Sequence, residues 1–222
     1  MQAKLITFEG TDGVGKTTHV SRATAFLAEQ KIAVSSYREP GATALGEELR
    51  DILKRGVVKA SMAELMLFTA ARAELVHTHV IPDLARGVFV VLDRFTDSTL
   101  AYQGALGQID EAELHACCQA AAQRLIPDLT LWLDLEPGDA FQRGYPLAQA
   151  LGSDAPVDTE LDAIEQRSVG YFSRVRERYR ALAEAERERI VRIDASGSID
   201  ETASLVRDTL VARLKIWREK DS

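Results

Sequence analysis

The glycine-rich segment Gly10-Thr-Asp-Gly-Val-Gly15-Lys16-Thr17 has the residue types and spacing that bind nucleotide phosphates. Its glycines let the backbone turn several N–H groups toward one point, and a helix beginning near Lys16 adds the partial positive charge of its N-terminus. The ammonium group of Lys16 can reach β- and γ-phosphate oxygens. The segment therefore predicts an ATP site formed by Gly10, Gly13, Gly15, Lys16, Thr17 and Thr18.

A candidate metal ligand follows an apolar run further along the chain. Asp93 ends the run Val88–Leu92, and an acid at the end of a buried strand can hold Mg²⁺ opposite a phosphate loop. An acid at a strand end alone more often caps a helix. The adjacent Arg94, whose planar guanidinium suits phosphate oxygens, favours the metal site. We expect Thr17 and Asp93 to be the Mg²⁺ ligands.

A sheet is needed to bring these segments together, and five short apolar runs predict its strands. Such runs, rich in β-branched and aromatic residues and separated by long helical stretches, are typical of parallel strands covered on both faces. The sequence therefore predicts an α/β fold with a five-stranded parallel sheet flanked by helices. The runs are Leu5–Phe8, Ile32–Val34, Val88–Leu92, Leu129–Leu135 and Ile190–Ile193.

The pattern breaks after the fourth run. Proline and glycine recur between residues 136 and 160, so we expect a flap there, inserted within a single domain of residues 1–222. Helical spacing of apolar side chains resumes at Leu161, Ile164, Tyr171, Phe172, Val175, Tyr179 and Leu182. A last helix is expected from Asp200 to about Trp217, with Leu205, Leu210 and Leu214 on one face.

The composition is that of an ordinary folded domain, with 46% hydrophobic and 27% charged residues in a chain of 222. A net charge of −7 gives no overall positive field for nucleic acid or anionic lipid. No run approaches the ~20 apolar residues of a membrane span, and the N-terminus does not resemble a signal peptide. We expect a cytoplasmic protein without nucleic-acid or membrane partners, and we expect Cys117 and Cys118 to be reduced thiols.

Five motifs occur in an order that is typical of one enzyme family. They are Phe8-Glu-Gly-Thr-Asp-Gly-Val-Gly-Lys-Thr-Thr18, Arg38-Glu-Pro-Gly41, Phe68-Thr-Ala-Ala-Arg72, Asp93-Arg-Phe-Thr-Asp-Ser-Thr-Leu-Ala-Tyr-Gln-Gly104 and Pro127-Asp-Leu-Thr-Leu-Trp-Leu-Asp134. Together they resemble the bacterial thymidylate kinases, of the P-loop nucleoside-monophosphate kinase superfamily, from about residue 3 to 195. The resemblance implies ATP- and Mg²⁺-dependent phosphorylation of dTMP to dTDP by a cytosolic homodimer.

The resemblance also implies how a nucleotide base and sugar are held. Phe68 would stack on thymine, and Arg72, one helical turn further on, would donate to its O4. Thr99 and Gln103 would complete the hydrogen-bonding edge of the base. Tyr102 would crowd the 2′ position and favour deoxyribose.

The phosphates are assigned in the same way. Arg50 and Arg94 would grip the dTMP phosphate, and Asp12 and Glu39 would lie near the acceptor sugar and the metal. The segment 194–198 resembles the loop on the adenine side of the family's ATP site. Lys16, Arg94 and Asp12 are the implied catalytic residues in this part of the chain.

The family places a cationic side chain near the transferred phosphoryl group, and this chain lacks one at the usual positions. The phosphate loop carries Val14 where the family can have a cationic side chain, and residues 144–166 contain five acids but no Lys or Arg. Arg143 is then the predicted fourth catalytic residue, with Arg167 as the other candidate. Two alternatives stay open: a nucleotide-binding paralogue with little kinase activity, and a kinase for another monophosphate.

Overall fold

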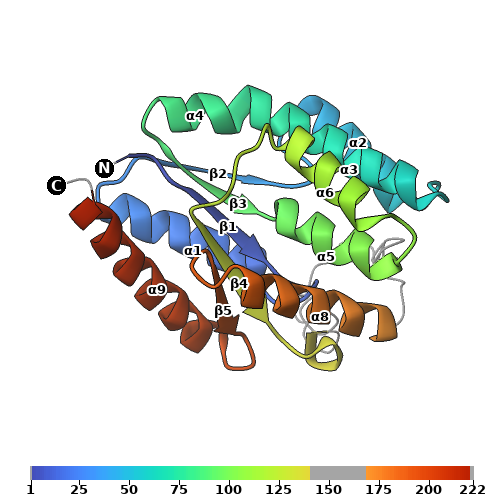
Figure 1. Ribbon diagram of the computed structural model, residues 1–222. Helices are drawn as coiled ribbons and strands as arrows, with labels where there is room; N and C mark the ends of the chain where they lie inside the picture. Colours follow the sequence, from blue (N-terminus) through green and yellow to red (C-terminus); the bar gives the residue numbers. More distant parts are fainter. Residues whose placement is uncertain (1, 141–168, 221–222) are drawn as a thin grey trace, which may run out of the picture.

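The computed structural model describes residues 2–140 and 169–220. Its strands β1 (Leu5–Glu9), β2 (Val34–Arg38), β3 (Phe89–Asp93), β4 (Leu129–Asp134) and β5 (Ile190–Asp194) form one sheet in the order β2-β3-β1-β4-β5 (Figure 1). All four pairings are parallel. The predicted α/β class and five-stranded parallel sheet are confirmed. With β1 in the centre, the chain after β1 lies next to the carboxyl end of β3.

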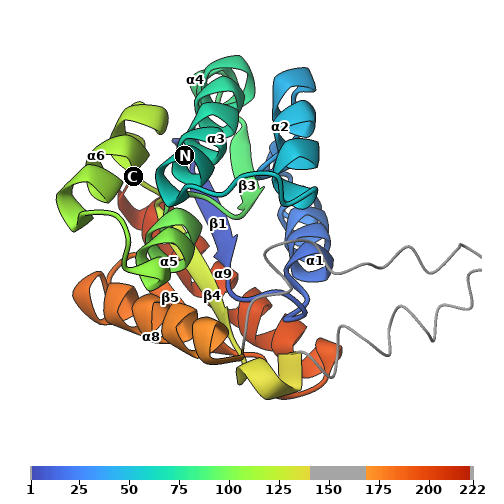
Figure 2. The same cartoon turned by 90° about the vertical axis from the view of Figure 1, so that its right-hand side faces the viewer.

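Helices cover both faces of the sheet (Figures 1 and 2). One face packs against α1 (Lys16–Glu29) and α9 (Ile199–Lys220). The other carries α3 (Ser61–Leu75), α5 (Thr96–Leu106), α6 (Glu111–Ala121) and α8 (Val169–Ala185). A short π-helix, η1 (Val76–Val80), joins α3 to α4 (Ile81–Ala85), and α2 (Ala44–Lys54) packs on α3. The predicted layering of helices around the sheet is therefore present.

Side chains of the central strand β1 alternate between the two faces. Ile6 and Phe8 join the core beneath α1 and α9, whereas Leu5 joins the core on the opposite face. Because successive strand residues point to opposite faces, Thr7 and Glu9 share the side of Leu5. Both are fully buried. The central strand thus places polar groups in the interior on the side of α5.

The predicted second strand, Ile32–Val34, is wrong in its bounds, because β2 begins at Val34 and ends at Arg38. Within the described residues β2 pairs only with β3, so it is an edge strand of this sheet. Its residues are half-buried or exposed. The strand can therefore contain two serines, because their hydroxyl groups are not fully buried. The position of an apolar run therefore does not predict the bounds of this strand.

The predicted face of the last helix is also wrong in one residue. Leu205 is 44% exposed, and the buried positions of α9 include Val206, Leu210 and Leu214. These three residues are four apart and lie on one face. Leu205 precedes Leu210 by five residues, which turns it away from that face by about 140°.

The described part of the chain contains only the beginning of the predicted flap. The backbone N–H groups of Asp139 and Ala140 donate to the carbonyl of Glu136, so the flap starts as a helical turn. Its remainder lies outside the described residues. In α8, Tyr171, Phe172, Val175 and Tyr179 are buried as predicted. Within residues 2–140 and 169–220, no helix has the length and apolar character needed to cross a membrane.

Candidate active site

The phosphate loop links β1 to α1 through residues 10–15 and comes into close contact with the end of β4 and the chain that follows it. Gly10 has φ +139°, and a Cβ there would lie 2.5 Å from the carbonyl oxygen of Leu133. A Cβ on Gly13, which has φ +79°, would overlap the carbonyl of Ala140. Any larger residue would displace the loop at both places. Gly15 ends the loop as the N-cap of α1.

Lys16 places a buried cation at the start of α1. Its side chain is 8% exposed, and Nζ donates to the carbonyl of Thr11 at 2.8 Å. Burial and the neighbouring Arg94 cation lower the pKa of Lys16 to about 8, against the opposing charge of Asp12. A bound polyphosphate would supply the negative charge that holds Lys16 protonated. Thr18, the third residue of α1, is exposed at the same end of the helix.

The two predicted Mg²⁺ ligands touch each other. Thr17 Oγ1 donates to Asp93 Oδ2 at 2.8 Å, which joins the first turn of α1 to the carboxyl end of β3. In the described ranges, no group of three or more His, Cys, Asp or Glu side chains converges on a metal position. Mg²⁺ at phosphate sites takes one or two protein oxygens besides water and phosphates. The hydroxyl and carboxylate present here fit that donor set.

Arg94 follows β3 with φ +72°, in the left-handed region. Its guanidinium donates to the carbonyl of Gly10 and to Ser98 Oγ, both at 3.0 Å, and to Tyr102 at 3.2 Å. It also forms an ion pair with Asp12. These contacts fix Arg94 between the phosphate loop and helix α5.

Asp12, in the phosphate loop, is the partner of Arg94 at this junction between the loop and α5. Burial alone would raise the pKa of the Asp12 carboxyl group, but the Arg94 and Lys16 cations outweigh burial and lower the pKa to about 2. Tyr102 donates to Asp12 Oδ2 at 3.1 Å. The catalytic prediction for Lys16, Arg94 and Asp12 therefore concerns three groups that lie together, whereas Arg143 lies outside the described residues.

A cavity adjoins this junction, between α2, α3 and α5. Its lining includes Asp12 and all eight residues predicted to bind substrate: Glu39, Arg50, Phe68, Arg72, Arg94, Thr99, Tyr102 and Gln103. Their binding roles stay predictions. Sequence reasoning missed four lining residues: Pro40, Leu53, Lys54 and Ser98. Lys54 and Ser98 each stand four residues after a predicted arginine, so helical spacing was a signal for those two.

Arg72 lies at the closed end of the cavity and is 2% exposed. Its Nε donates to Glu39 Oε2 at 2.8 Å, and its Nη2 donates to the carbonyl of Phe95 and to Thr99 Oγ1, both at 2.9 Å. Burial raises the pKa of Glu39, and the Arg72 cation opposes that rise. Within the described chain, the buried Nη1 of Arg72 and Oε1 of Glu39 have no hydrogen-bond partner. A buried donor without a partner is suited to a ligand acceptor.

Glu39 was predicted near the sugar and the metal. That role stays a prediction; in the structure its carboxylate lies against Arg72, and its backbone N–H donates to the carbonyl of Asp93 at 2.9 Å. The side chain of Glu39 therefore orients Arg72, the arginine that is predicted to contact the base. Only its backbone approaches a predicted metal ligand.

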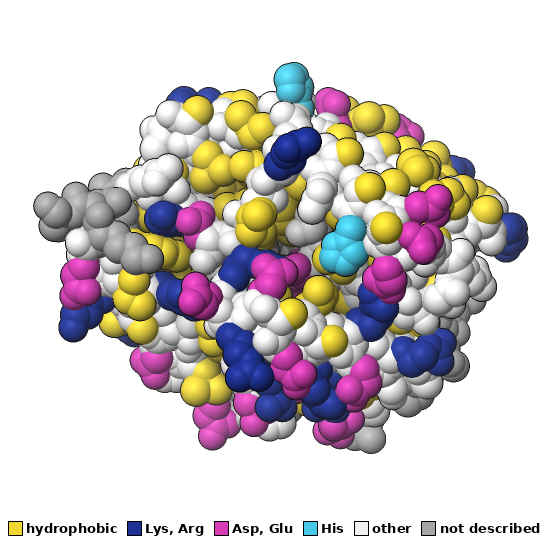
Figure 3. Space-filling model, in the orientation of Figure 1, with side chains coloured by type: hydrophobic (Ala, Val, Ile, Leu, Met, Phe, Trp, Pro, Cys, Tyr) yellow, Lys and Arg dark blue, Asp and Glu magenta, His cyan; other side chains and the backbone are white. Residues whose placement is uncertain are grey.

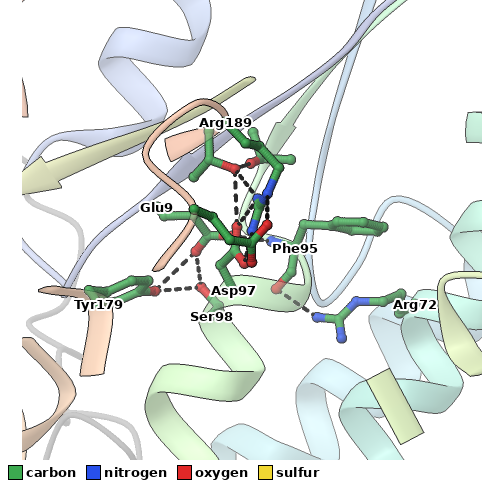
Figure 4. A network of polar contacts seen from close by, with 10 residues as sticks. Glu9, Arg72, Phe95, Asp97, Ser98, Tyr179 and Arg189 are labelled. Atoms are coloured by element: carbon green, nitrogen blue, oxygen red, sulfur yellow. Dashed lines mark hydrogen bonds and ion pairs between the residues drawn. The ribbon is translucent and has the colours of Figure 1, made fainter. Parts of the chain in front are cut away.

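A buried polar network supports the N-terminus of α5 (Figure 4). Glu9 is fully buried and accepts from the backbone N–H of Phe95 at 2.8 Å, from Ser98, and from Tyr179 at 3.0 Å. Phe95 is the N-cap of α5 and has no side-chain cap of its own. Burial and the nearby Asp97 carboxylate raise the pKa of Glu9 to about 7. Glu9 therefore holds the segment that carries Arg94, a role that sequence reasoning missed.

Asp97 belongs to the same network. Its carboxylate pairs with Arg189 at 2.7 Å and accepts from Thr130 at 3.0 Å (Figure 4). This ion pair ties the first turn of α5 to the segment before β5. The carboxylate charge of Asp97 is thereby balanced, whereas no cation touches Glu9 among the described contacts.

A phosphate loop after the central strand, a carboxylate at the end of the neighbouring strand and an arginine-lined cavity beside them define a kinase of the P-loop nucleoside-monophosphate class. The family model of thymidylate kinase matches residues 8–206. The thymidylate kinase of Chlorobium chlorochromatii (strain CaD3) is 39% identical over 215 residues, which is 96% of each chain. That of Synechococcus sp. (strain JA-3-3Ab) is 43% identical over 209 residues, 94% of this chain and 96% of the relative. The chain belongs to the thymidylate kinase family.

The pKa of Glu9 gives a prediction about stability. Between its ordinary value of 4.5 and about 7, the folded state binds more protons than the unfolded state, so the unfolding free energy falls as pH rises through this window. The full effect is on the order of 3 kcal/mol. In Glu9→Gln this fall should be absent. The unfolding free energy of the wild type minus that of Glu9→Gln should therefore decrease from about pH 5 to about pH 8.

Urea denaturation at both pH values measures this difference. Glu113→Gln is the matched control, because Glu113 is exposed on α6 and its replacement should give a flat difference. A flat difference for Glu9→Gln as well would contradict the prediction.

Proposed function

We propose that this protein transfers the γ-phosphoryl group of ATP to dTMP and forms dTDP. The observation that carries the proposal is the junction of Arg94 and Asp12, where a phosphate loop meets a cavity. Arg72 Nη1, which has no partner among the described residues, is buried at that cavity. The thymidylate kinase names of the relatives support the same reaction.

In this proposal the protein acts by positioning and by electrostatic stabilisation. An oxygen of the dTMP phosphate attacks the γ-phosphorus, and the bond from that phosphorus to the bridging oxygen of ADP breaks. Lys16 neutralises charge on the ATP side, and Arg50 and Arg94 hold the acceptor phosphate from the cavity side. Thr17 and Asp93 would hold Mg²⁺, which when bound would supply positive charge to offset that of the phosphates.

The cavity also fits the base and sugar of dTMP. Phe68 and Arg72 line it from one face of α3, so a thymine ring can stack on Phe68 while its O4 accepts from Arg72 Nη1. Tyr102, whose hydroxyl is held by Asp12, would stand against the 2′ position of the sugar. Neither the described site nor the comparisons favour the nucleotide-binding paralogue.

A coupled assay of ADP release with dTMP, dUMP, dCMP and dGMP tests the proposal. Turnover should be highest with dTMP. Lys16→Ala should reduce turnover by at least about a hundredfold, because it removes a cation aimed at the transferred phosphoryl group. The dTMP affinity of Lys16→Ala, measured by calorimetry, should be unchanged, since Lys16 does not line the cavity. Wild-type turnover without any monophosphate preference would refute the proposed reaction.

We also propose Arg143 as the cation that stabilises the transition state, because Val14 and residues 144–166 supply none. With dTMP saturating, Arg143→Ala should lower kcat by about a hundredfold or more. Arg167→Ala is the matched control and should retain kcat. Equal, wild-type turnover in both variants would place the cation elsewhere.

We propose that the protein acts in the cytoplasm as a homodimer. Hydrophobic side chains gather over the α3 and α6 region of the surface (Figure 3). Met62 and Met66 of α3 are 37% and 48% exposed, and Ala112, Ala116 and Ala120 are exposed at four-residue spacing on α6. Small side chains beside flexible methionines allow two helices to approach closely.

Light scattering after gel filtration tests the dimer. The wild type should have twice the 24.4 kDa mass of one chain. Met66→Glu should be monomeric, because the charge would be buried in the interface. Leu205→Glu introduces the same charge at an exposed position of α9, and this variant should remain dimeric. A dimeric Met66→Glu would exclude this surface.

A further inference from the structure

A buried amide lies at the closed end of the cavity, held by a carboxylate from another helix. Gln103 of α5 is 2% exposed and lines the cavity. Its Nε2 donates to Oε1 of Glu64 on α3 at 2.9 Å. Glu64 is itself buried, with 8% of its surface exposed. The contact therefore joins two helices in the interior, away from bulk water.

This contact determines which end of the Gln103 amide faces the cavity. A glutamine amide carries a donor end and an acceptor end of nearly the same shape, so a cavity wall alone does not select between them. A carboxylate only accepts hydrogen bonds, and the NH₂ end must therefore face Glu64. Oε1 of Gln103, which accepts no hydrogen bond within the described chain, is the amide atom left for a ligand.

Arg72 supplies a fixed donor to the same cavity. Thr99 stands one helical turn before Gln103 on α5 and accepts from Nη2 of Arg72. The remaining nitrogen of Arg72, Nη1, is buried without a partner among the described residues. The cavity lining thus includes a donor from Arg72 and an acceptor from Gln103. Oε1 of Glu39 is a further acceptor there, and the other oxygen of that carboxylate is held by Arg72 Nε.

The order of donor and acceptor matches one class of pyrimidine. Thymine and uracil carry an acceptor at O4 next to a donor at N3–H, which complements this pair. Cytosine carries a donor at N4 next to an acceptor at N3, so both of its groups would oppose the pair. A site that leaves buried polar groups without partners discriminates strongly against the wrong ligand.

We propose that Glu64 is a specificity-determining positioning residue, which selects 4-oxo pyrimidine monophosphates over cytosine by fixing the amide of Gln103. The proposal rests on the proposed function, in which the cavity takes the monophosphate acceptor. Glu64 reaches no reacting atom in this role and acts through Gln103.

Glu64→Gln tests the proposal with almost no change of shape. A glutamine at position 64 can offer either its oxygen or its NH₂ group, so Gln103 is free to present its own NH₂ group to N3 of cytosine. The ratio of kcat/KM for dTMP to that for dCMP should fall by about tenfold or more. The ratio for dTMP to dUMP should not change, because both bases carry O4 and N3–H. Glu48→Gln, an exposed site on α2, is the matched control and should keep both ratios.

A second variant keeps the test decisive if Glu64→Gln does not fold. Gln103→Leu removes the acceptor itself, and it should lower the dTMP to dCMP ratio by a similar factor while the dTMP to dUMP ratio stays constant. An unchanged dTMP to dCMP ratio in both variants would overturn the proposal. An equal loss of activity with all three monophosphates would also overturn it, because that result indicates a purely structural role. Failure of the wild type to phosphorylate dTMP would instead refute the proposed function.

Discussion

The ion pair between Arg94 and Asp12 is the interaction on which the arrangement of the candidate site depends. Asp12 comes from the loop after β1, and Arg94 follows β3 directly. These strands are neighbours, and their parallel register places Phe8 opposite Asp93, so both following segments leave the sheet at the same level. The pair thereby joins the phosphate loop to the wall of the cavity. In the proposed reaction, donor and acceptor phosphates meet at this junction.

The backbone that carries Arg94 needs support of its own. Arg94 has a positive φ, which costs a non-glycine residue of the order of 1 kcal/mol or more. Glu9 supplies part of that support by accepting from the N–H of Phe95 and from Ser98, which in turn accepts from Arg94. The central strand therefore holds Arg94 in two ways: the Phe8 carbonyl accepts from the backbone N–H of Arg94 at 2.9 Å, and Glu9 acts through the first turn of α5.

Sequence reasoning succeeded where the chemistry lies in contiguous residues or at helical spacing. The phosphate loop is one segment, and the pairs Phe68 with Arg72 and Thr99 with Gln103 are four residues apart on helices, so each pair reaches one cavity. The interior strands were visible as apolar runs. The edge strand β2 was misplaced because partial exposure removes that signal.

Contacts between elements that are distant in the chain could not be predicted from the sequence. Glu9 ends a strand, where a single sequence gives no reason to bury a carboxylate, and its partner Tyr179 is 170 residues away. Glu64 and Gln103 are 39 residues apart and on different helices. Neither contact follows from periodicity, because periodicity assigns a residue to a face but does not say which side chain lies across from it.

Three buried acidic side chains surround the candidate site, and their shared property is that each one only accepts hydrogen bonds when it is ionised. Glu9 accepts from the Ser98 hydroxyl, Glu39 from the Arg72 guanidinium and Glu64 from the Gln103 amide. Burying a carboxylate is unfavourable for stability, and apolar replacements of buried ionic groups are often neutral or stabilising. Stability alone is therefore a poor reason for three such groups. Each one, however, fixes the direction of a partner that would otherwise rotate or flip, and those partners are the groups that face the cavity and the phosphate loop.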